Sequence, residues 1–434
     1  MENRSPAPHT NMTHKPTPIQ TLARLLLALA LSLACIWSAW QAVRFGLGRV
    51  LAGYGLMTNE LAPVDQALRL SPDDPDARVN RAALLSQRGE HQEAAAELER
   101  AAQLRPRDYY LWLELGMARD RMGDAARAEL AFREAKRLAP HYAQPAWQLG
   151  NLLFRAGLEE EALGELVRAA KTDPTLLPAI IELTWAARPN ATAVRELLKP
   201  QTSLEHLALA RFFAKRGAGA EAVVEFRGAG TPNLEEAASL INQLIAQGAY
   251  RDAREAWVYA YLSGNANPEP PDVLIYDGGF ERALTIDDPG FGWRVSQTLP
   301  NIKLSQDSAN AREGGKSLRV DFRGITNPVA VVSQMILVEP KTHYRLQFAS
   351  RTQELVSGGL PFIAVSEATP PRVQIAETPV LAGGTDQWRD STLEFDTGPQ
   401  THAVLVQVLR KGCTPEPCPI FGSLWLDAFV LTKS

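Results

Sequence analysis

The feature of this 434-residue sequence that most limits its fold is a proline that recurs every 34 residues. It stands at Pro72, Pro106, Pro140 and Pro174, and small residues recur in register between these positions. Proline tends to end a helix because it lacks an amide N–H and its ring clashes with the preceding turn. A period of this length is typical of a helix–turn–helix unit, which buries a continuous core only by stacking on its neighbours.

Each unit places a small residue where two helices must approach closely, and a glycine at the turn between them. An alanine on the second helix and a large residue facing the next unit complete the pattern. In order, these residues are Ala82, Gly89, Ala94 and Leu98, then Gly116, Gly123, Ala128 and Phe132, then Gly150, Gly157, Ala162 and Leu166. The pattern resembles the tetratricopeptide repeat family. This resemblance implies a solenoid of helix pairs that binds protein partners along its inner face.

The repeat pattern extends beyond its clearest units in both directions. A half unit ends at Pro72, and the segment 191–200 is too short for a full second helix. Two looser units follow, marked by Gly217, Ala222, Phe226 and Ala229, then by Gly248, Ala253, Trp257 and Ala260. We therefore expect an irregular helical solenoid over residues 58–263.

Helical spacing along the first helices predicts which side chains face a protein-binding groove. The candidates are Tyr110, Met117, Asp120, Arg121, Trp147, Asn151, Phe154 and Arg155. The alternative is that the aromatic residues in this set are ordinary core. The family's carboxylate clamp, which grips C-terminal peptides, needs a lysine and an asparagine where this chain has Val79 and Ala83. Binding of chaperone tails is therefore not expected.

An apolar run near the N-terminus predicts a membrane anchor. From Leu25 to Val43 the sequence contains no charged residue, which is long enough for a helix to cross a bilayer. We predict a signal-anchor helix over residues 21–45, after a polar tail over residues 1–20 that we expect to be disordered. A cleaved signal peptide and a lipoprotein modified at Cys35 are the alternatives. The anchor is favoured because the apolar residues continue past Cys35 and no clear cleavage site precedes a polar segment.

The cysteines help to predict which side of the membrane the rest of the chain faces. Cys413 and Cys418 flank a short proline-rich loop and could form a local disulfide, which would indicate an oxidising compartment. The alternative is two unpaired thiols; zinc is not expected, because two sulfurs leave it half coordinated. Positive charges are only slightly more frequent before the apolar run than after it. The composition, rich in alanine, leucine and arginine, is typical of bacteria. We therefore predict a single-pass protein of a bacterial inner membrane, with its remaining chain in the periplasm.

The C-terminal part of the chain changes its period to two. A proline-rich linker is predicted at residues 264–271, and alternating apolar residues appear beyond it, as in Leu318, Val320 and Phe322. About nine short strands separated by turn residues predict an antiparallel β-sandwich over residues 272–434.

The order of motifs in this part resembles the jelly-roll carbohydrate-binding modules of the galactose-binding-like fold. The motif "YDGGFE" at residues 276–281 opens it and "LDAF" at residues 426–429 closes it, although the family usually has asparagine at the position of Asp277 and often a second closing aspartate. The resemblance implies a structural calcium held by Glu281 and Asp427. The alternative is that Glu281 accepts backbone hydrogen bonds and ties the first strand to the last.

Glycan binding in such a module would use exposed aromatic rings, since flat apolar rings suit the faces of sugar rings. Trp293 is the best candidate, with Phe291 beside it. The alternative reading makes Trp293 a core residue, and we expect Trp388 and Trp425 to be core as well.

The sequence contains none of the common nucleotide-binding or hydrolase motifs. The net charge of −4 argues against a nucleic-acid-binding protein, which would need a basic stripe. We therefore expect a membrane-anchored, non-enzymatic scaffold with a protein partner and a polysaccharide or envelope contact, in exopolysaccharide or cell-envelope assembly. The alternatives are a glycan-active enzyme using Asp287, Asp288 or Glu281, and a cytosol-facing assembly adaptor.

Overall fold

The computed structural model describes residues 18–231, 233–262, 273–286, 288–295, 301–325, 330–413 and 416–434. The chain falls into two compact units, Met1–Ala187 and Arg188–Ser434. Most of the predicted N-terminal tail and the whole predicted linker at 264–271 lie outside the described residues.

The first unit begins with the long helix α1 (Pro18–Thr58), whose segment from Leu25 to Val43 is apolar and almost wholly exposed. In the part of the chain that the structure describes, it is the one helix long and apolar enough to cross a membrane. Its last turns pack instead on α2 (Leu61–Leu70) and bury Ala52. A Cβ at Gly55 would lie 2.6 Å from Val64 Cγ2, so the glycine permits this close approach. Helix α1 therefore combines an exposed apolar segment with the first packed helix of the unit.

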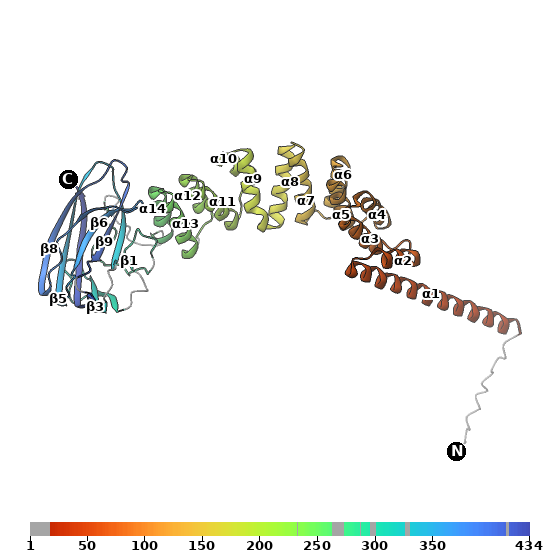
Figure 1. The fold of residues 1–434 in the computed structure, drawn as a ribbon, viewed down its shortest axis with the longest axis horizontal. Helices are drawn as coiled ribbons and strands as arrows, with labels where there is room; N and C mark the ends of the chain where they lie inside the picture. The colour runs from red at the N-terminus through yellow and green to blue at the C-terminus, as the bar shows by residue number, and fades with distance from the viewer. Residues whose placement is uncertain are drawn as a thin grey trace, which may run out of the picture. The chain divides into compact units, whose positions relative to one another are not determined.

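Three helix pairs and a final helix follow in the first unit (Figure 1). They are α3 (Pro75–Gln87) and α4 (His91–Leu104), α5 (Tyr109–Arg121) and α6 (Ala125–Leu138), α7 (Ala143–Arg155) and α8 (Glu159–Thr172), then η1 (Pro174–Leu176) and α9 (Leu177–Ala187). The predicted roles of the small residues are confirmed. A Cβ at Gly116 would lie 2.5 Å from the Phe132 ring, and Ala128 is fully buried between the helices.

The second unit starts with shorter helices. These are α10 (Ala191–Leu198), α11 (Ser203–Lys215), α12 (Gly219–Gly228), α13 (Leu234–Ala246) and α14 (Tyr250–Trp257), which continues into the π-helical turn η2 (Val258–Leu262). Helix α10 has only eight residues, as its short sequence segment predicts. Phe226 and Trp257 are buried at the positions predicted for the large residue of each loose unit.

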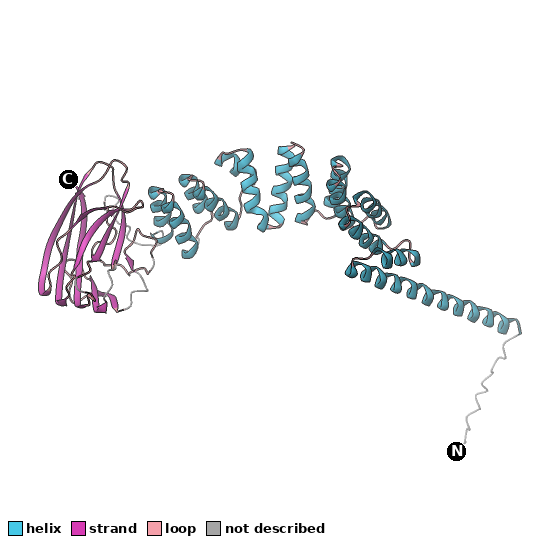
Figure 2. Ribbon diagram, in the orientation of Figure 1, coloured by secondary structure: helices cyan, strands magenta, loops and turns pink. Residues whose placement is uncertain are grey.

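The rest of the second unit is a sandwich of two five-stranded antiparallel sheets, drawn in magenta in Figure 2. One sheet has the order β1 (Arg294–Val295), β4 (Val332–Leu337), β9 (Ala403–Arg410), β6 (Pro361–Glu367) and β7 (Gln374–Glu377). The other has the order β2 (Ile302–Asp307), β3 (Ser317–Ile325), β10 (Ile420–Lys433), β5 (His343–Val356) and β8 (Gly384–Asp396). The predicted antiparallel β-sandwich is thus present.

The sandwich core lies between the sheets and follows the period-two pattern of the strands. On β5, for example, Tyr344, Leu346 and Phe348 are buried and alternate with outward polar residues. Trp425 of β10 is buried as predicted, but on the outer face of its sheet, opposite Arg319 of β3. The guanidinium groups of Arg319 and Arg351 lie 5.0 and 5.3 Å from its ring centroids. Trp425 is therefore covered by cations rather than by the apolar core.

Helix α14 packs against the sandwich within the second unit. The indole of Trp257 donates a hydrogen bond to Asp288 at 2.9 Å, and its ring lies 5.0 Å from Tyr276. This contact explains why the last helices and the sandwich belong to one compact unit.

Candidate functional site

A groove between α3 and α5 in the first unit is the candidate site for a protein partner. It encloses a hollow of about 250 Å³. The residues that line it come from three helices: Val79, Ala82, Ala83 and Ser86 of α3, Ala94 and Leu98 of α4, and Tyr110, Glu114, Ala118 and Arg121 of α5.

The groove exists because its floor is built from small side chains. Ala82, Ala94 and Ala118 are all buried and belong to one apolar cluster with Leu98. Residues three and four positions apart share a helix face, so α3 and α5 each present a row of side chains to the groove. The floor can accept an apolar side chain from a partner, since alanines leave space that larger residues would fill.

Polar groups on α5 form the rim of the groove. Tyr110 is 46% exposed, and burial together with the neighbouring Glu114 carboxylate raises the pKa of its phenol above the ordinary value. Arg121 is exposed at the end of α5 and forms no ion pair within the described residues. The groove therefore combines an apolar floor with one unpaired cation.

The structure brings only Tyr110 and Arg121 of the eight predicted groove residues into this hollow. Asp120 of α5 and Arg155 of α7 bind each other, with Oδ2 and Nη2 2.6 Å apart. This pair joins two helices, so neither charge is unpaired.

The remaining predicted groove residues have local or packing roles. The Asn151 amide donates to the Trp147 carbonyl at 2.9 Å, and Met117 and Phe154 pack against the apolar core. The prediction missed the α3 side of the groove, including Ala83 and Ser86. Applying to α3 the same helical spacing that was used on α5 would have found them.

The rings of Phe291 and Trp293, the predicted glycan-stacking residues, are buried and cannot stack on a sugar. The prediction of a glycan site at these two rings is therefore wrong. Phe291 and Trp293 are 0% and 4% exposed. Trp293 stacks on Phe280 with ring centroids 4.9 Å apart, and its indole donates to the Asp277 carbonyl at 2.9 Å. Phe291 lies against Trp257 of α14. Trp293 thus closes the opening turn onto the core and has the alternative role of a core residue, whereas Phe291 packs on α14.

Glu281 and Asp427 both bind the loop that precedes β3. The Glu281 carboxylate accepts from the backbone N–H groups of Gly315 and Lys316 at 2.6 and 3.0 Å. Asp427 accepts from the N–H groups of Arg312 and Glu313 at 2.7 and 3.2 Å. The two side chains thus hold the same loop, residues 312–316, and the opening segment also meets the last strand directly, where the Phe429 N–H donates to the Gly278 carbonyl at 2.9 Å.

These two carboxylates make only part of a calcium site. Calcium takes six to eight oxygen ligands, and the described residues contain no cluster of three or more His, Cys, Asp or Glu side chains that could hold a metal. Backbone N–H groups, which repel a cation, point at oxygens of both carboxylates. Burial raises the pKa of Asp427, although its backbone hydrogen bonds oppose this. Both carboxylates hold the loop through these backbone N–H groups, and calcium stays a prediction.

Cys413 and Cys418 are joined in a disulfide, with Cα atoms 5.6 Å apart. Beside it the buried guanidinium of Arg410 donates to the Cys418 carbonyl and, at 3.1 Å, to the Gly359 carbonyl. Burial lowers the pKa of Arg410. Cys35 is a free thiol exposed on α1.

Of the carboxylates considered for catalysis, Asp288 is buried and fully engaged. Its Oδ1 accepts from the N–H groups of Gly290 and Gly292 at 2.7 and 2.9 Å, and its Oδ2 accepts from Trp257. Asp287 lies outside the described residues. Asp288 therefore stabilises a turn.

Comparison with known proteins identifies the repeat directly. The family model of the tetratricopeptide repeat matches residues 109–142, which form α5 and α6. Similar solved structures include a MamA RS-1 ArsTM double mutant, 18% identical, covering 36% of this chain and 95% of that chain, with a TM-score of 0.32. PilF of Pseudomonas aeruginosa is 15% identical, covering 51% of this chain and 90% of that chain, with a TM-score of 0.32.

A carbohydrate-binding module also has similarity to this chain. TmCBM61, solved in complex with beta-1,4-galactotriose, is 18% identical, covering 37% of this chain and 99% of that chain, with a TM-score of 0.26. No curated protein sequence matches the chain. The chain thus contains a tetratricopeptide repeat among helix pairs of the same pattern, followed by a β-sandwich and preceded by an apolar helix.

Proposed function

We propose that this protein is a membrane-anchored, non-enzymatic scaffold that recruits a protein partner through its helical repeats. The observation that carries the proposal is the groove between α3 and α5, with its alanine-lined floor and the unpaired Arg121 at its rim. The partner segment would insert an apolar side chain into the hollow and place an acidic group near Arg121. Val79 and Ala83 line the groove where a carboxylate clamp would need polar side chains, which favours an internal segment over a C-terminal tail.

Photo-crosslinking in intact membranes tests the groove. A crosslinker replacing Ser86 should yield a defined adduct, whereas one replacing the exposed Thr172 of α8 should not. Arg121→Ala should remove most of the Ser86 adduct. Arg155→Ala is the matched control, because this arginine occupies the corresponding helix end but is paired with Asp120. An adduct that resists Arg121→Ala, or that is equally strong from position 172, would contradict the proposal.

We also propose that the exposed apolar segment of α1 spans a bacterial inner membrane and that the rest of the chain faces the periplasm. The Cys413–Cys418 disulfide supports this orientation, since disulfides persist in oxidising compartments. Protease added to spheroplasts should digest the C-terminal sandwich. Its complete protection would instead favour a cytosol-facing adaptor.

In this proposal the sandwich contacts a glycan or another envelope component, in exopolysaccharide or cell-envelope assembly. Its antiparallel two-sheet architecture supports the idea, and TmCBM61 is a module that was solved with a galactotriose. Binding of the full-length protein to an array of envelope polysaccharides tests it. The enzyme alternative requires hydrolysis of such a polysaccharide that is lost on Asp288→Asn without unfolding, although the hydrogen bonds of Asp288 favour a structural role.

A further inference from the structure

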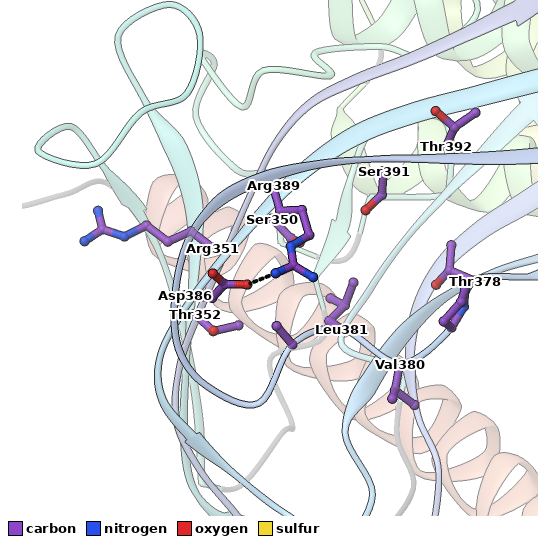
Figure 3. A pocket seen from close by; sticks show the side chains of 12 residues that line it. Ser350, Arg351, Thr352, Thr378, Val380, Leu381, Asp386, Arg389, Ser391 and Thr392 are labelled. Carbon is purple, nitrogen blue, oxygen red and sulfur yellow. Dashed lines mark ion pairs between the residues drawn. The ribbon is translucent and has the colours of Figure 1, made fainter.

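A pocket opens at one edge of the sandwich, between β8 of one sheet and the segment that follows β7 of the other (Figure 3). It encloses about 260 Å³. One ordered water needs only about 10–15 Å³ of such space, so the pocket admits a small molecule. Its floor includes the buried Ser350, Thr352 and Leu381, whereas Val380 and Arg389 are exposed at its mouth.

The pocket forms where the interior of the sandwich changes from apolar to polar. Along the inward face of β5, Leu346 and Phe348 belong to the apolar core, but the next two inward residues are Ser350 and Thr352. On the neighbouring β8, Ser391 lies opposite Phe348 and Arg389 lies opposite Ser350. Both strands therefore replace core residues with hydrogen-bonding side chains at the same level of the sandwich.

The hydroxyl of Thr352 is buried in this pocket without a partner. Its side chain belongs to a residue that is 1% exposed, and its Oγ1 has no hydrogen bond within the described residues. A buried hydroxyl left unpaired destabilises a protein. By contrast, the buried Thr378 on the opposite wall accepts a hydrogen bond from the Ile363 N–H at 3.0 Å. A ligand that hydrogen-bonds to Thr352 would satisfy the one buried side-chain group of this pocket that has no partner within the described residues.

Charged groups at the mouth of the pocket neutralise each other. Arg389 Nη2 and Asp386 Oδ2 are 2.8 Å apart and form the ion pair drawn in Figure 3. Arg351 also borders the pocket, but its side chain points away from the others in Figure 3 and its guanidinium lies over Trp425. The pocket therefore offers both donors and acceptors without a net charge.

From this geometry we infer that the pocket binds one neutral sugar unit of a glycan. Sugar hydroxyls both donate and accept hydrogen bonds, as do the hydroxyls of Thr352 and Ser391. The Asp386–Arg389 pair supplies an acceptor and a donor side by side, which suits two neighbouring sugar hydroxyls. The absence of net charge disfavours phosphate or an acidic sugar. The inference rests on the proposal that the sandwich contacts a glycan, and it assigns the site and the ligand class.

Saturation-transfer NMR on the full-length protein in detergent micelles tests the site. The neutral probes are methyl β-D-galactopyranoside and methyl α-D-glucopyranoside, and the anionic probes are glucuronic acid and, by competition, inorganic phosphate. Thr352→Val removes the hydroxyl and keeps the shape of the side chain. Asp386→Asn provides a second variant at the mouth of the pocket. The matched control is Thr184→Val, a buried threonine of α9 whose hydroxyl is bonded to the Ile180 carbonyl.

We expect a neutral probe to bind the wild type and the Thr184→Val control alike. Thr352→Val should weaken binding about tenfold or more, the scale of losing one good hydrogen bond to a ligand. The same variant should raise the Tm of the free protein, because it removes an unpaired buried hydroxyl. Asp386→Asn should also weaken binding.

Each contrary outcome has a distinct meaning. If wild-type protein binds a polysaccharide or a neutral probe, but neither Thr352→Val nor Asp386→Asn weakens it, the site is elsewhere and only the inference fails. If no glycan or neutral probe binds, the glycan part of the proposed function fails as well. Binding of the anionic probes alone would overturn the assignment of a neutral sugar.

Discussion

The indole N–H of Trp257 at the end of α14 donates to the buried carboxylate of Asp288 at 2.9 Å. The other oxygen of Asp288 holds the turn at residues 288–292 through two backbone N–H groups. One carboxylate thus connects the last helix of the second unit to the segment that enters the sandwich.

Trp257→Phe should loosen this connection. The variant keeps an aromatic ring but leaves one Asp288 oxygen without its donor, at an expected cost of about 1–3 kcal/mol. Hydrogen-exchange mass spectrometry should show faster exchange in residues 250–262 and 288–295. Trp112→Phe is the control, because its indole donates to the Pro106 carbonyl in the first unit. Unchanged exchange in both segments of Trp257→Phe would show that the bond is dispensable.

Gly116→Ala should destabilise the first unit by about 1–3 kcal/mol, the usual cost of overpacking. The added Cβ would lie 2.5 Å from the Phe132 ring, which is buried and cannot move aside freely. Gly164→Ala is the opposite control, since that helical glycine of α8 has open space around it. It should stabilise the protein by about 0.5–1 kcal/mol, because alanine favours the helix. Chemical denaturation followed by far-UV circular dichroism measures both, and equal effects would contradict the close helix contact.

Asp307 should make the sandwich sensitive to acid. Burial alone would raise its pKa, but hydrogen bonds from Asn310, Trp425 and the Ala309 N–H lower it below its ordinary value. The folded state therefore binds this proton less readily than the unfolded state. The stabilisation is fully present above the unfolded pKa of about 3.9 and is lost as the pH falls through the lower folded pKa.

Asp307→Asn tests this pH dependence, because asparagine keeps an acceptor for the Trp425 indole. Calorimetry from about pH 3 to pH 7 should show a lower Tm for the variant at neutral pH and a smaller difference in acid. A difference that stays constant across this range would show that ionisation of Asp307 does not contribute.

Glu281→Ala should destabilise the sandwich even in the presence of a chelator. The variant leaves the N–H groups of Gly315 and Lys316 without their acceptor, which should cost about 1–3 kcal/mol. Thermal unfolding of the wild type and the variant with EGTA measures this. An unchanged Tm would contradict the fastening role of Glu281.

The same samples test the predicted calcium. An ion bound by Glu281 and Asp427 should stabilise the wild type by about 2.7 kcal/mol at a hundredfold excess over its Kd. Glu281→Ala should lose this gain. A wild-type Tm that does not respond to calcium would exclude the ion and leave the backbone hydrogen bonds as the whole function of the pair.

The contacts that the sequence predicts correctly are those between residues of one helix or of one helix pair. Gly116 and Phe132 belong to one helix pair, so their spacing alone predicts that they meet. Tyr110 and Arg121 were found in the groove because both lie on α5, whereas the α3 wall required knowing which helix faces which. Asp120 and Arg155 looked available from spacing, but their mutual ion pair crosses between helices and was not visible in either helix alone.

For aromatic residues in the sandwich, too, the surroundings depend on residues that are distant in the sequence. Trp293 follows a glycine-rich segment, and its sequence context allows either an exposed sugar-binding ring or a core residue; Phe280 and Phe429 enclose it in the core. Trp425 was predicted as core, yet its burial comes from Arg319 and Arg351 on the outer face.

The sequence by itself determined the periodicities: a 34-residue helical repeat, a period of two in the strands, and an apolar segment long enough for a membrane. These depend on backbone geometry and hydrophobicity, which act over a few neighbouring residues. Only the tertiary structure decided which polar groups have no partner among the described residues: Thr352 keeps a buried hydroxyl without a hydrogen bond, and Arg121 forms no ion pair there. Whether a side chain is satisfied depends on residues distant in sequence, because a hydrogen bond or ion pair needs a partner that folding alone brings within reach.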